Sequence, residues 1–404
     1  MNPVLTALHA AEIASLSVAY LFLLYLLLLT ALAARARLRT GFPATSHRRF
    51  AVVVPAHNEE GGISDTVRSI RAMGYPRDRF DTVVIADNCS DSTASRARAA
   101  GATVLERSEP GLRGKGHALR WGFDRLLDGN DAYDGIVVID ADSAVSSNYL
   151  SVMNWYIGQG ARVIQSSDLV APGNHSWSAQ MTRIGFLLYN YVRPLGRTSI
   201  GGSAGLRGNG MCFTTPVLRT FPWNAYSITE DLEYGLQLLL GGVGVRFAPE
   251  ATVYAVMPRE SKNAEGQRAR WEGGRLALIR RYALPLLMKF VRGGSVAFLD
   301  AFLDLTVPAL VNLVGLVLVA ALLSQSLTWL GVSSMSTYSI LWLAAAAMGF
   351  IHLFAGLWIA GADRSLYRAL FQMPRYAVWK VFVYARMPGR WSSDVWIRTT
   401  REIH

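Results

Sequence analysis

The stretch GIVVIDAD, residues 135–142, is a short apolar run that leads directly into two acidic residues. Short β-branched runs bounded by turn residues are typical of buried strands. Similar runs alternate with helical patterns: strands are predicted at 50–59, 81–87 and 161–167, and helices at 61–74, 91–101 and 114–127. Because alternating strands and helices build a mostly parallel sheet with helices on both faces, residues 48–262 are predicted to form one α/β domain.

Polar and acidic side chains follow the predicted strands. The first strand runs into His57 and Glu59, the second into Asp87, and the third into Asp140 and Asp142. Each acid alone has a structural explanation, since such residues commonly cap a helix or form a turn. Ligands of parallel α/β sheets, however, bind at the carboxyl ends of the strands. The repetition of acids at that edge therefore predicts a ligand site.

Asp140 and Asp142 have the spacing to share a metal ion. Hard divalent cations prefer carboxylate oxygens and keep phosphate oxygens as further ligands, so a cation here would neutralise a diphosphate leaving group. Lys115 supports the same interpretation, because glycines on both sides, at a predicted helix start, let the backbone approach a phosphate. The spacing is not that of a P-loop, so ATP hydrolysis is not expected.

A further acidic motif opens a predicted helix in YSITEDLEYGLQLLL, residues 226–240. One interpretation is structural: Ser227 and Glu230 would form a capping box, and the helix dipole favours acids in the first turn. The other is chemical: Asp231 would be a general base that takes a proton from an attacking hydroxyl. The local sequence does not separate the two.

The composition points to a membrane, since 51% of the residues are hydrophobic and only 17% are charged. Three uncharged apolar segments are long enough to cross about 30 Å of hydrocarbon, at 13–34, 305–323 and 339–361. The first lacks the basic start and the small-residue cleavage site of a signal peptide, so we expect it to be a retained transmembrane helix.

Basic residues predict the orientation. Arginines cluster after the first span and again in the tail at 362–404, so residues 1–12 are predicted to be extracytoplasmic, and the α/β domain and the basic interfacial tail cytoplasmic. The expected location is the inner (plasma) membrane, crossed several times. The net charge of +11 then indicates attraction to the membrane surface and no nucleic-acid partner. Cys89 and Cys212 fall in the cytoplasmic part, where a disulfide is not expected.

The region 263–294 joins the soluble and membrane parts. Its spacing places Gln267, Arg270 and Trp271 on one helical face. Residues 275–294 form a basic amphipathic helix of the kind that lies in the headgroup plane. The segment 181–197 has the same character, and it is predicted to be either a second interfacial helix or a core helix of the α/β domain.

Six motifs occur in order along residues 48–275: VVVPAHNE, ADNCSDST, GKGHAL, DAD, TED and QRARW. With a membrane helix on each side, this order resembles membrane-embedded family 2 glycosyltransferases of the GT-A fold. The group includes cellulose, hyaluronan and poly-N-acetylglucosamine synthases and ceramide glucosyltransferase. The resemblance implies a GT-A domain, a UDP-sugar donor, a lipid or saccharide acceptor, and Mg²⁺ or Mn²⁺ as cofactor.

The resemblance also implies a role for individual residues. Asp87 corresponds to the acid that recognises the uracil base, Asp142 to the direct metal ligand, and Asp231 to the catalytic base. The remaining expected roles are metal binding for Asp140, catalysis for Glu230, nucleotide-sugar contacts for Pro55, His57, Glu59, Lys115, Asp140, Gln267, Arg270 and Trp271, and acceptor contacts for Asn209, Gly210 and Trp271.

The implied reaction is an inverting transfer that forms a β-glycosidic bond on a membrane-associated acceptor. Two other functions stay open. A processive polysaccharide synthase would also translocate its polymer, and three spans are few for that unless interfacial helices or oligomers contribute. A non-catalytic membrane scaffold would have no need for acids at successive strand ends.

Overall fold

The computed structural model describes the backbone of residues 3–43, 46–128, 133–173, 176–256, 261–332 and 335–385. It describes their side chains except those of residues 261–269, 381 and 383–385.

One sheet of eight strands, in the order β3-β2-β1-β4-β7-β6-β8-β5, forms the α/β domain. The strands are β1 (Phe50–Ala56), β2 (Phe80–Asp87), β3 (Thr103–Arg107), β4 (Gly135–Val138), β5 (Ser143–Val145), β6 (Val163–Val170), β7 (Met211–Thr214) and β8 (Arg246–Ala255). Four neighbouring pairs are parallel and three are antiparallel. The predicted, mostly parallel sheet is therefore confirmed, with the predicted strands as β1, β2, β4 and β6.

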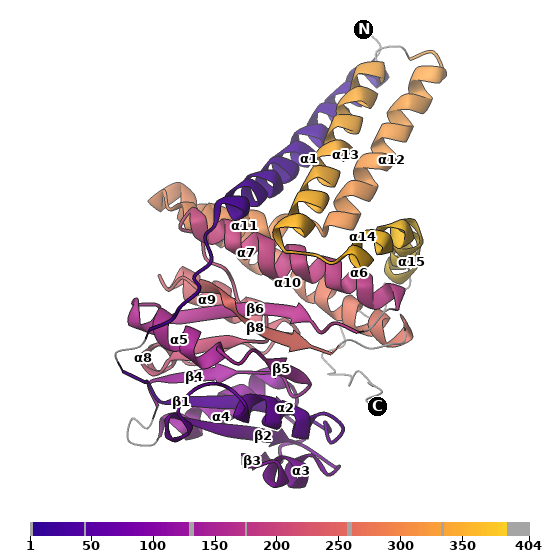
Figure 1. Cartoon of the computed structure of the whole chain (residues 1–404). Coiled ribbons are helices and arrows are strands. Elements are labelled where there is room, and N and C mark those ends of the chain that lie inside the picture. Colours follow the sequence, from indigo (N-terminus) through magenta and orange to yellow (C-terminus); the bar gives the residue numbers. More distant parts are fainter. Residues whose placement is uncertain are drawn as a thin grey trace.

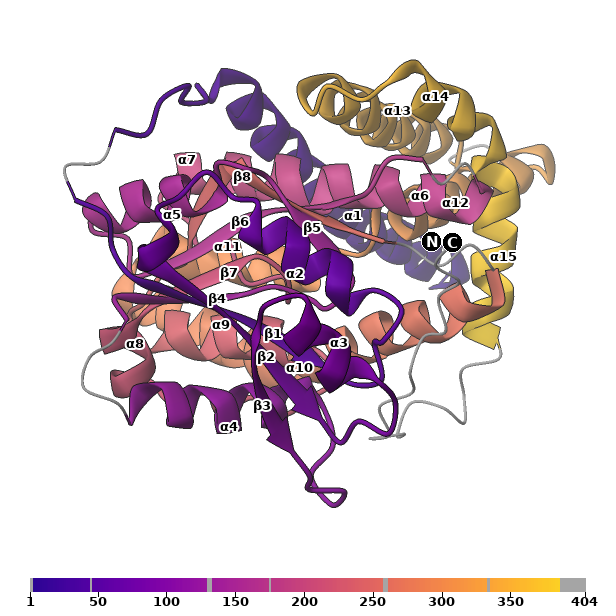
Figure 2. The same cartoon turned by 60° about the horizontal axis from the view of Figure 1, so that its bottom comes forward.

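Side chains of the central strands enter two apolar cores, one on each face of the sheet. Successive side chains of β1 alternate between the two cores. Ala51 and Val53 belong to the core formed with α4 (Lys115–Leu127), α8 (Thr215–Thr220) and α9 (Glu230–Leu240). Phe50, Val52 and Val54 belong to the core formed with α2 (Ile63–Arg71), α3 (Thr93–Ala99) and α5 (Tyr149–Gly158). A short 3₁₀ turn, η1 (Arg77–Arg79), leads into β2. Figure 2 shows α2 and α3 in front of the parallel strands. The predicted helices at 61–74, 91–101 and 114–127 are confirmed.

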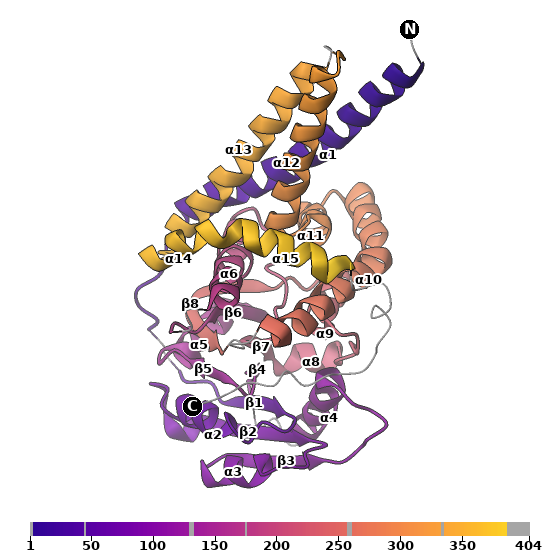
Figure 3. The same cartoon turned by 90° about the vertical axis from the view of Figure 1, so that its right-hand side faces the viewer.

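A layer of helices lies across the top of this domain (Figures 1 and 3). It comprises α6 (Trp177–Phe186), the π-helix η2 (Leu187–Val192), α7 (Arg193–Ser199), α10 (Ser261–Gly293), α11 (Val296–Thr306), α14 (Arg364–Ala369), η4 (Leu370–Gln372) and α15 (Met373–Ala385). The segment 181–197 belongs to this layer and is buried on both sides. Val192 and Leu195 belong to the core that the sheet forms with α4, α8 and α9. Leu187 and Leu188 pack with apolar residues of the segment 353–376.

Within the described part of the chain, three helices are long and apolar enough to cross a membrane: α1 (Pro3–Arg35), α12 (Leu310–Trp329) and α13 (Ser336–Ile359). They project together from the helical layer, away from the sheet (Figure 1). α1 contains the predicted span 13–34, and α13 covers most of 339–361. α12 begins at Leu310, later than the predicted start at residue 305. The reason is that α11 ends at Thr306, and Pro308 prevents the helix from continuing into α12.

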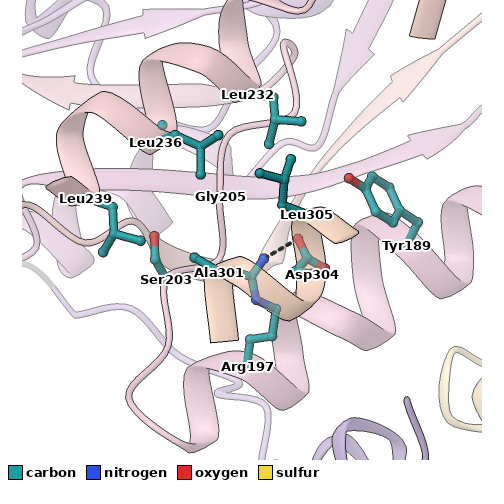
Figure 4. Close-up of a pocket in the computed structure, with 11 residues that line it drawn as sticks. Tyr189, Arg197, Ser203, Gly205, Leu232, Leu236, Leu239, Ala301, Asp304 and Leu305 are labelled. Carbon is teal, nitrogen blue, oxygen red and sulfur yellow. Dashed lines mark hydrogen bonds and ion pairs between the residues drawn. The ribbon is translucent and has the colours of Figure 1, made fainter. Parts of the chain in front are cut away.

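A buried ionic cluster ties the helical layer together. In α7, Arg197 donates from Nε to Asp300 Oδ2 at 2.8 Å and from Nη1 to Asp304 Oδ2 at 2.7 Å, both in α11. Tyr25 of α1 donates to the other oxygen of Asp300 at 2.9 Å. Figure 4 shows Arg197 and Asp304 beside a small cavity of about 20 Å³, room for roughly one water molecule. The cluster thus joins α1, α7 and α11.

Replacing Arg197 by Met should lower the free energy of unfolding by about 3–5 kcal/mol, because Asp300 and Asp304 would stay buried without this cation. Denaturant unfolding of the full chain in detergent micelles measures the change. Arg68→Met is the matched control, since its pair with Asp65 is exposed and contributes at most about 1 kcal/mol. Equal stability of the two variants would contradict a structural role for the cluster.

Candidate active site

One cavity of about 450 Å³ lies at the carboxyl edge of the sheet, within the size range of small-molecule sites. Predicted site residues line one part of it: Lys115, Asp140, Asp142, Asn209, Glu230, Asp231 and Trp271. Aliphatic and aromatic side chains from the helical layer and from α12 and α13 line another part, here called the apolar wall: Ile184, Leu188, Val311, Val314, Phe350 and Leu353. The cavity therefore reaches from the sheet edge to helices that are apolar enough to cross a membrane.

Lys115 provides a positive charge among these carboxylates. Its Nζ lies 2.5 Å from Asp140 Oδ1 and 2.5 Å from the carbonyl oxygen of Gly208. Burial would lower the pKa of Lys115, but Asp140 and the two acids of α9 outweigh it and raise that pKa above its ordinary value. The position depends on close packing at Gly116, where a Cβ would lie 2.3 Å from the carbonyl oxygen of Ala225.

Glu230 and Asp231 occupy the first turn of α9. Burial and the charge of Asp231 raise the pKa of Glu230 to about 8, and burial also raises the pKa of Asp231, while Lys115 opposes both shifts. The capping-box prediction is wrong. The helix starts at Glu230, and the backbone N–H of Ser227 donates to Glu233 at 3.4 Å instead. Because Glu233 takes this contact, Glu230 is left facing the cavity.

Helix α10 approaches the start of α9 and carries Arg270 and Trp271; of these two residues, Trp271 lines the cavity and Arg270 does not. Gly274 permits the approach, because a Cβ there would lie 2.7 Å from Thr229 Cγ2, at the N-terminus of α9. Trp271 lines the cavity with its ring centroid 5.9 Å from that of Phe186 in α6. Burial lowers the pKa of Arg270, and the charge of Glu230 acts in the opposite direction, which places this guanidinium near the acids of α9. The side chain of Gln267 lies outside the described residues.

Two neighbouring parallel strands, β1 and β2, carry the next group of predicted residues. Asp87, expected to recognise the base, ends β2, and Pro55, His57 and Glu59, expected to contact the nucleotide sugar, lie at the end of β1 or just after it. A ring nitrogen of His57, Nδ1, lies 2.7 Å from the carbonyl oxygen of Asp87. The Asp87 side chain is buried and pairs with Arg107 of β3 at 2.5 Å. The edge continues from β1 to β4, which leads into Asp140. Pro55, His57, Glu59 and Asp87 therefore lie along the sheet edge beside the cavity and are not among the residues that line it.

Asn209 and Gly210 differ in what they can contact. Asn209 lines the cavity, and its Oδ1 accepts a hydrogen bond from the backbone N–H of Asp140 at 3.0 Å, so it holds the DAD segment in place. Gly210, at φ +71°, donates to the carbonyl of Val138 and accepts from the N–H of Ser166, both at 3.0 Å. A Cβ at Gly210 would lie 2.0 Å from Ser166 Oγ. Its predicted contact with the acceptor stays a prediction.

The cavity also contains charged residues outside the six motifs: Asp168, Arg193, Arg207, Arg275 and Lys380. Asp168 lies in β6, where burial and Asp140 raise its pKa well above the usual value. It accepts hydrogen bonds from Asn190 at 3.2 Å and Asn209 at 3.3 Å. The sequence carried one signal for it, the polar run QSSD (165–168) inside an otherwise apolar strand. Lys380 pairs with Glu272 at 2.7 Å and so joins α15 to α10.

The carboxylates at the DAD segment suit a divalent cation. Among the described residues, no group of three or more His, Cys, Asp or Glu side chains is arranged to hold a metal ion. Asp140 and Asp142 offer only hard oxygen ligands, which Mg²⁺ and Mn²⁺ prefer, and two carboxylates leave coordination positions for phosphate oxygens and water. The donor set therefore fits a cation that binds together with a nucleotide diphosphate.

Comparison with known proteins identifies the family. Residues 47–274, more than half of the chain, match the family model described as "Glycosyltransferase like family 2", and the chain belongs to this family. It is 24% identical to the probable glycosyltransferase YdaM of Bacillus subtilis (strain 168), over 58% of this chain and 57% of that protein. It is 29% identical to beta-monoglucosyldiacylglycerol synthase of Trichormus variabilis, over 55% of this chain and 48% of that protein. The chain thus matches about half the length of these curated relatives.

A solved structure extends the comparison beyond the α/β domain. The mannosyltransferase PcManGT from Pyrobaculum calidifontis, in complex with GDP-Man and Mn²⁺, has a TM-score of 0.53 and 18% sequence identity. The similarity covers 86% of this chain and 97% of that chain. The GT-A fold implied by the sequence motifs is therefore confirmed.

The glycine pair at 273–274 tests the approach of α10 to α9. Ala at Gly274 should destabilise the protein by about 1–3 kcal/mol, because its Cβ would overlap Thr229, and should lower transfer activity by about 10²-fold by moving Arg270 and Trp271. Ala at Gly273, where nothing lies within 4 Å of the added Cβ, should instead stabilise the helix by about 0.5–1 kcal/mol. Denaturant unfolding and activity of both variants provide the test, and equal behaviour would contradict the close packing.

Proposed function

We propose that the protein is an inverting glycosyltransferase that moves a sugar from a UDP-sugar to a lipid or lipid-linked acceptor at the membrane surface, forming a β-glycosidic bond. The continuity of the cavity carries the proposal. One part presents Asp140, Asp142 and Asp231 with Lys115, and another presents the apolar wall of helices apolar enough to cross a membrane. A charged donor and an apolar acceptor would meet in one enclosed space.

Asp231 is the proposed general base. Burial raises its pKa, which makes it a stronger base than an exposed aspartate. It takes the proton from the acceptor hydroxyl as this oxygen attacks the anomeric carbon, on the face opposite the departing nucleoside diphosphate. Because its pKa is raised to about 8, Glu230 keeps its proton near neutral pH and adds no second negative charge beside Asp231.

The leaving diphosphate needs positive charge. Asp140 and Asp142 would hold Mg²⁺ or Mn²⁺, which supplies Lewis-acid stabilisation of the departing phosphates. Lys115, beside Asp140, and the planar guanidinium of Arg270 add charge suited to phosphate oxygens. Trp271 offers an aromatic face on which a sugar ring stacks.

The acceptor side favours a lipid. One relative is named as a synthase of a glucosyldiacylglycerol, a glycolipid. The apolar wall consists of Ile, Leu, Val and Phe side chains, which suit a hydrocarbon chain. A processive synthase would need polar groups along its polymer path through the membrane helices, so we place it second.

The same proposal covers the nucleotide base of the donor and the membrane face on which the catalytic domain lies. The position of Asp87 at the sheet edge supports uridine, whereas PcManGT is crystallised with GDP-Man. UDP- and GDP-sugars should therefore be compared. The arginines that follow α1 support a catalytic domain on the cytoplasmic face.

Asp231→Asn should lower sugar transfer by about 10²–10⁴-fold, because the general base is lost, and should leave UDP binding in the presence of Mn²⁺ unchanged. Product formation on membrane lipids, followed by mass spectrometry, and calorimetric UDP binding measure the two effects.

Asp142→Ala is the complementary variant, expected to lose metal-dependent UDP binding. Asp124→Asn, on the half-exposed side of α4, serves as the charge-matched control with full activity. Full transfer by Asp231→Asn would refute the base, and UDP binding that is indifferent to both EDTA and Asp142→Ala would refute the metal.

A further inference from the structure

A buried cluster at the junction of α7, α10 and α11 holds more positive than negative groups. It contains the guanidinium groups of Arg193, Arg197, Arg207 and Arg275 and the carboxylates of Asp300 and Asp304. Arg197 is bound by both carboxylates. Arg275 donates to the backbone carbonyls of Asp304 at 2.7 Å and Leu305 at 3.0 Å. The charges within the cluster are therefore not balanced.

Arg193 keeps two donor atoms for which the described residues supply no hydrogen-bond partner. Its side chain is 4% exposed, and its Nη1 lies 3.7 Å from Asp304 Oδ1, beyond hydrogen-bond distance. Within the described part of the chain, neither Nε nor Nη1 has a hydrogen-bond partner. A buried donor without a partner is costly, and the cost is larger for a charged group. An anionic ligand would remove this cost by accepting charge-assisted hydrogen bonds.

The cluster opens onto the catalytic cavity. Arg193, Arg207 and Arg275 all line it. Arg193 directly follows η2, which contributes Leu188 to the apolar wall. At the other side, the positive charge of Arg207 is close enough to act on the carboxylate of Asp231. An anion bound here would lie along the path from the apolar wall to the proposed base.

We propose, building on the proposed function, that the acceptor is a phosphate-bearing lipid whose phosphate is bound by Arg193 and Arg207. Its hydrocarbon chains would lie against the apolar wall, and its hydroxyl would reach Asp231. Guanidinium groups match phosphate oxygens with paired hydrogen bonds. A neutral lipid would leave Nε and Nη1 of Arg193 without a hydrogen-bond acceptor. The donor diphosphate would be bound by other cations beside the sheet edge, Lys115 and the divalent ion that Asp140 and Asp142 would hold.

The test uses the full chain in detergent micelles, titrated separately with phosphatidic acid, with diacylglycerol of the same chain length and with inorganic phosphate. The wild type should bind phosphatidic acid at least about tenfold more tightly than diacylglycerol, and inorganic phosphate more weakly than either lipid. Arg193→Gln should lose the preference between the lipids, and Arg193→Lys should keep part of it. Arg280→Gln removes an exposed charge on α10 and should keep all of it. Manganese-dependent UDP binding should be the same in every variant.

The contrary results are distinct. Equal binding of the two lipids by the wild type, or inorganic phosphate binding as tightly as phosphatidic acid, would overturn the inference. So would loss of the preference in Arg280→Gln, which would indicate surface attraction. Weaker UDP binding by Arg193→Gln would assign the cluster to the donor and overturn this inference while leaving the proposed function intact. Absence of UDP binding by the wild type would contradict the proposed function itself, whatever the lipid preference.

Discussion

Mutual repulsion of the carboxylates that line one cavity is the constraint on which the site depends. Asp140 and Asp142 from the end of β4 and Glu230 and Asp231 from the start of α9 line one cavity, where burial raises the pKa of both α9 acids. Such an arrangement is stable only with compensating cations, because like charges in a poorly solvated site destabilise the ionised form. Lys115 compensates part of this charge, and a divalent cation would compensate more. Negative charge at this edge thus favours the binding of a divalent cation, which in turn attracts the diphosphate.

Close backbone packing keeps these groups together at the boundary with the apolar helices. Gly116 lets α4 approach the segment before α9, and Gly274 lets α10 approach Thr229. The Arg197–Asp300–Asp304 cluster fixes α7 to α11, and Tyr25 links both to α1. The helical layer therefore lies between the sheet and the long apolar helices (Figure 1) and is hydrogen-bonded to α1 through Tyr25. This explains how one cavity can be acidic at the sheet edge and aliphatic against α12 and α13.

Structural features that depend on neighbouring residues in the sequence could be predicted. Features that depend on contacts between residues far apart in the sequence could not. Short apolar runs predicted β1, β2, β4 and β6, the acids at strand ends predicted a ligand site that includes Asp140 and Asp142, and the family resemblance added Asp231 to it. β8 escaped because Pro249 and polar residues interrupt its pattern, and the pairing partner supplies what local propensity lacks. The capping box failed because Glu233, one turn further on, takes the contact with Ser227. Arg193 could not be recognised because its surroundings come from α10 and α11, about a hundred residues away.

The most direct test of the central claim is a structure of the full chain determined with Mn²⁺ and UDP. The account predicts manganese bound by Asp142, the diphosphate between that ion and the α10 helix at Arg270, and the base along the sheet edge at Asp87. It also predicts that the remaining cavity opens from the diphosphate toward Asp231 and the apolar wall. Manganese and UDP bound at any other surface, with Asp142 and Asp231 away from the nucleotide, would contradict it.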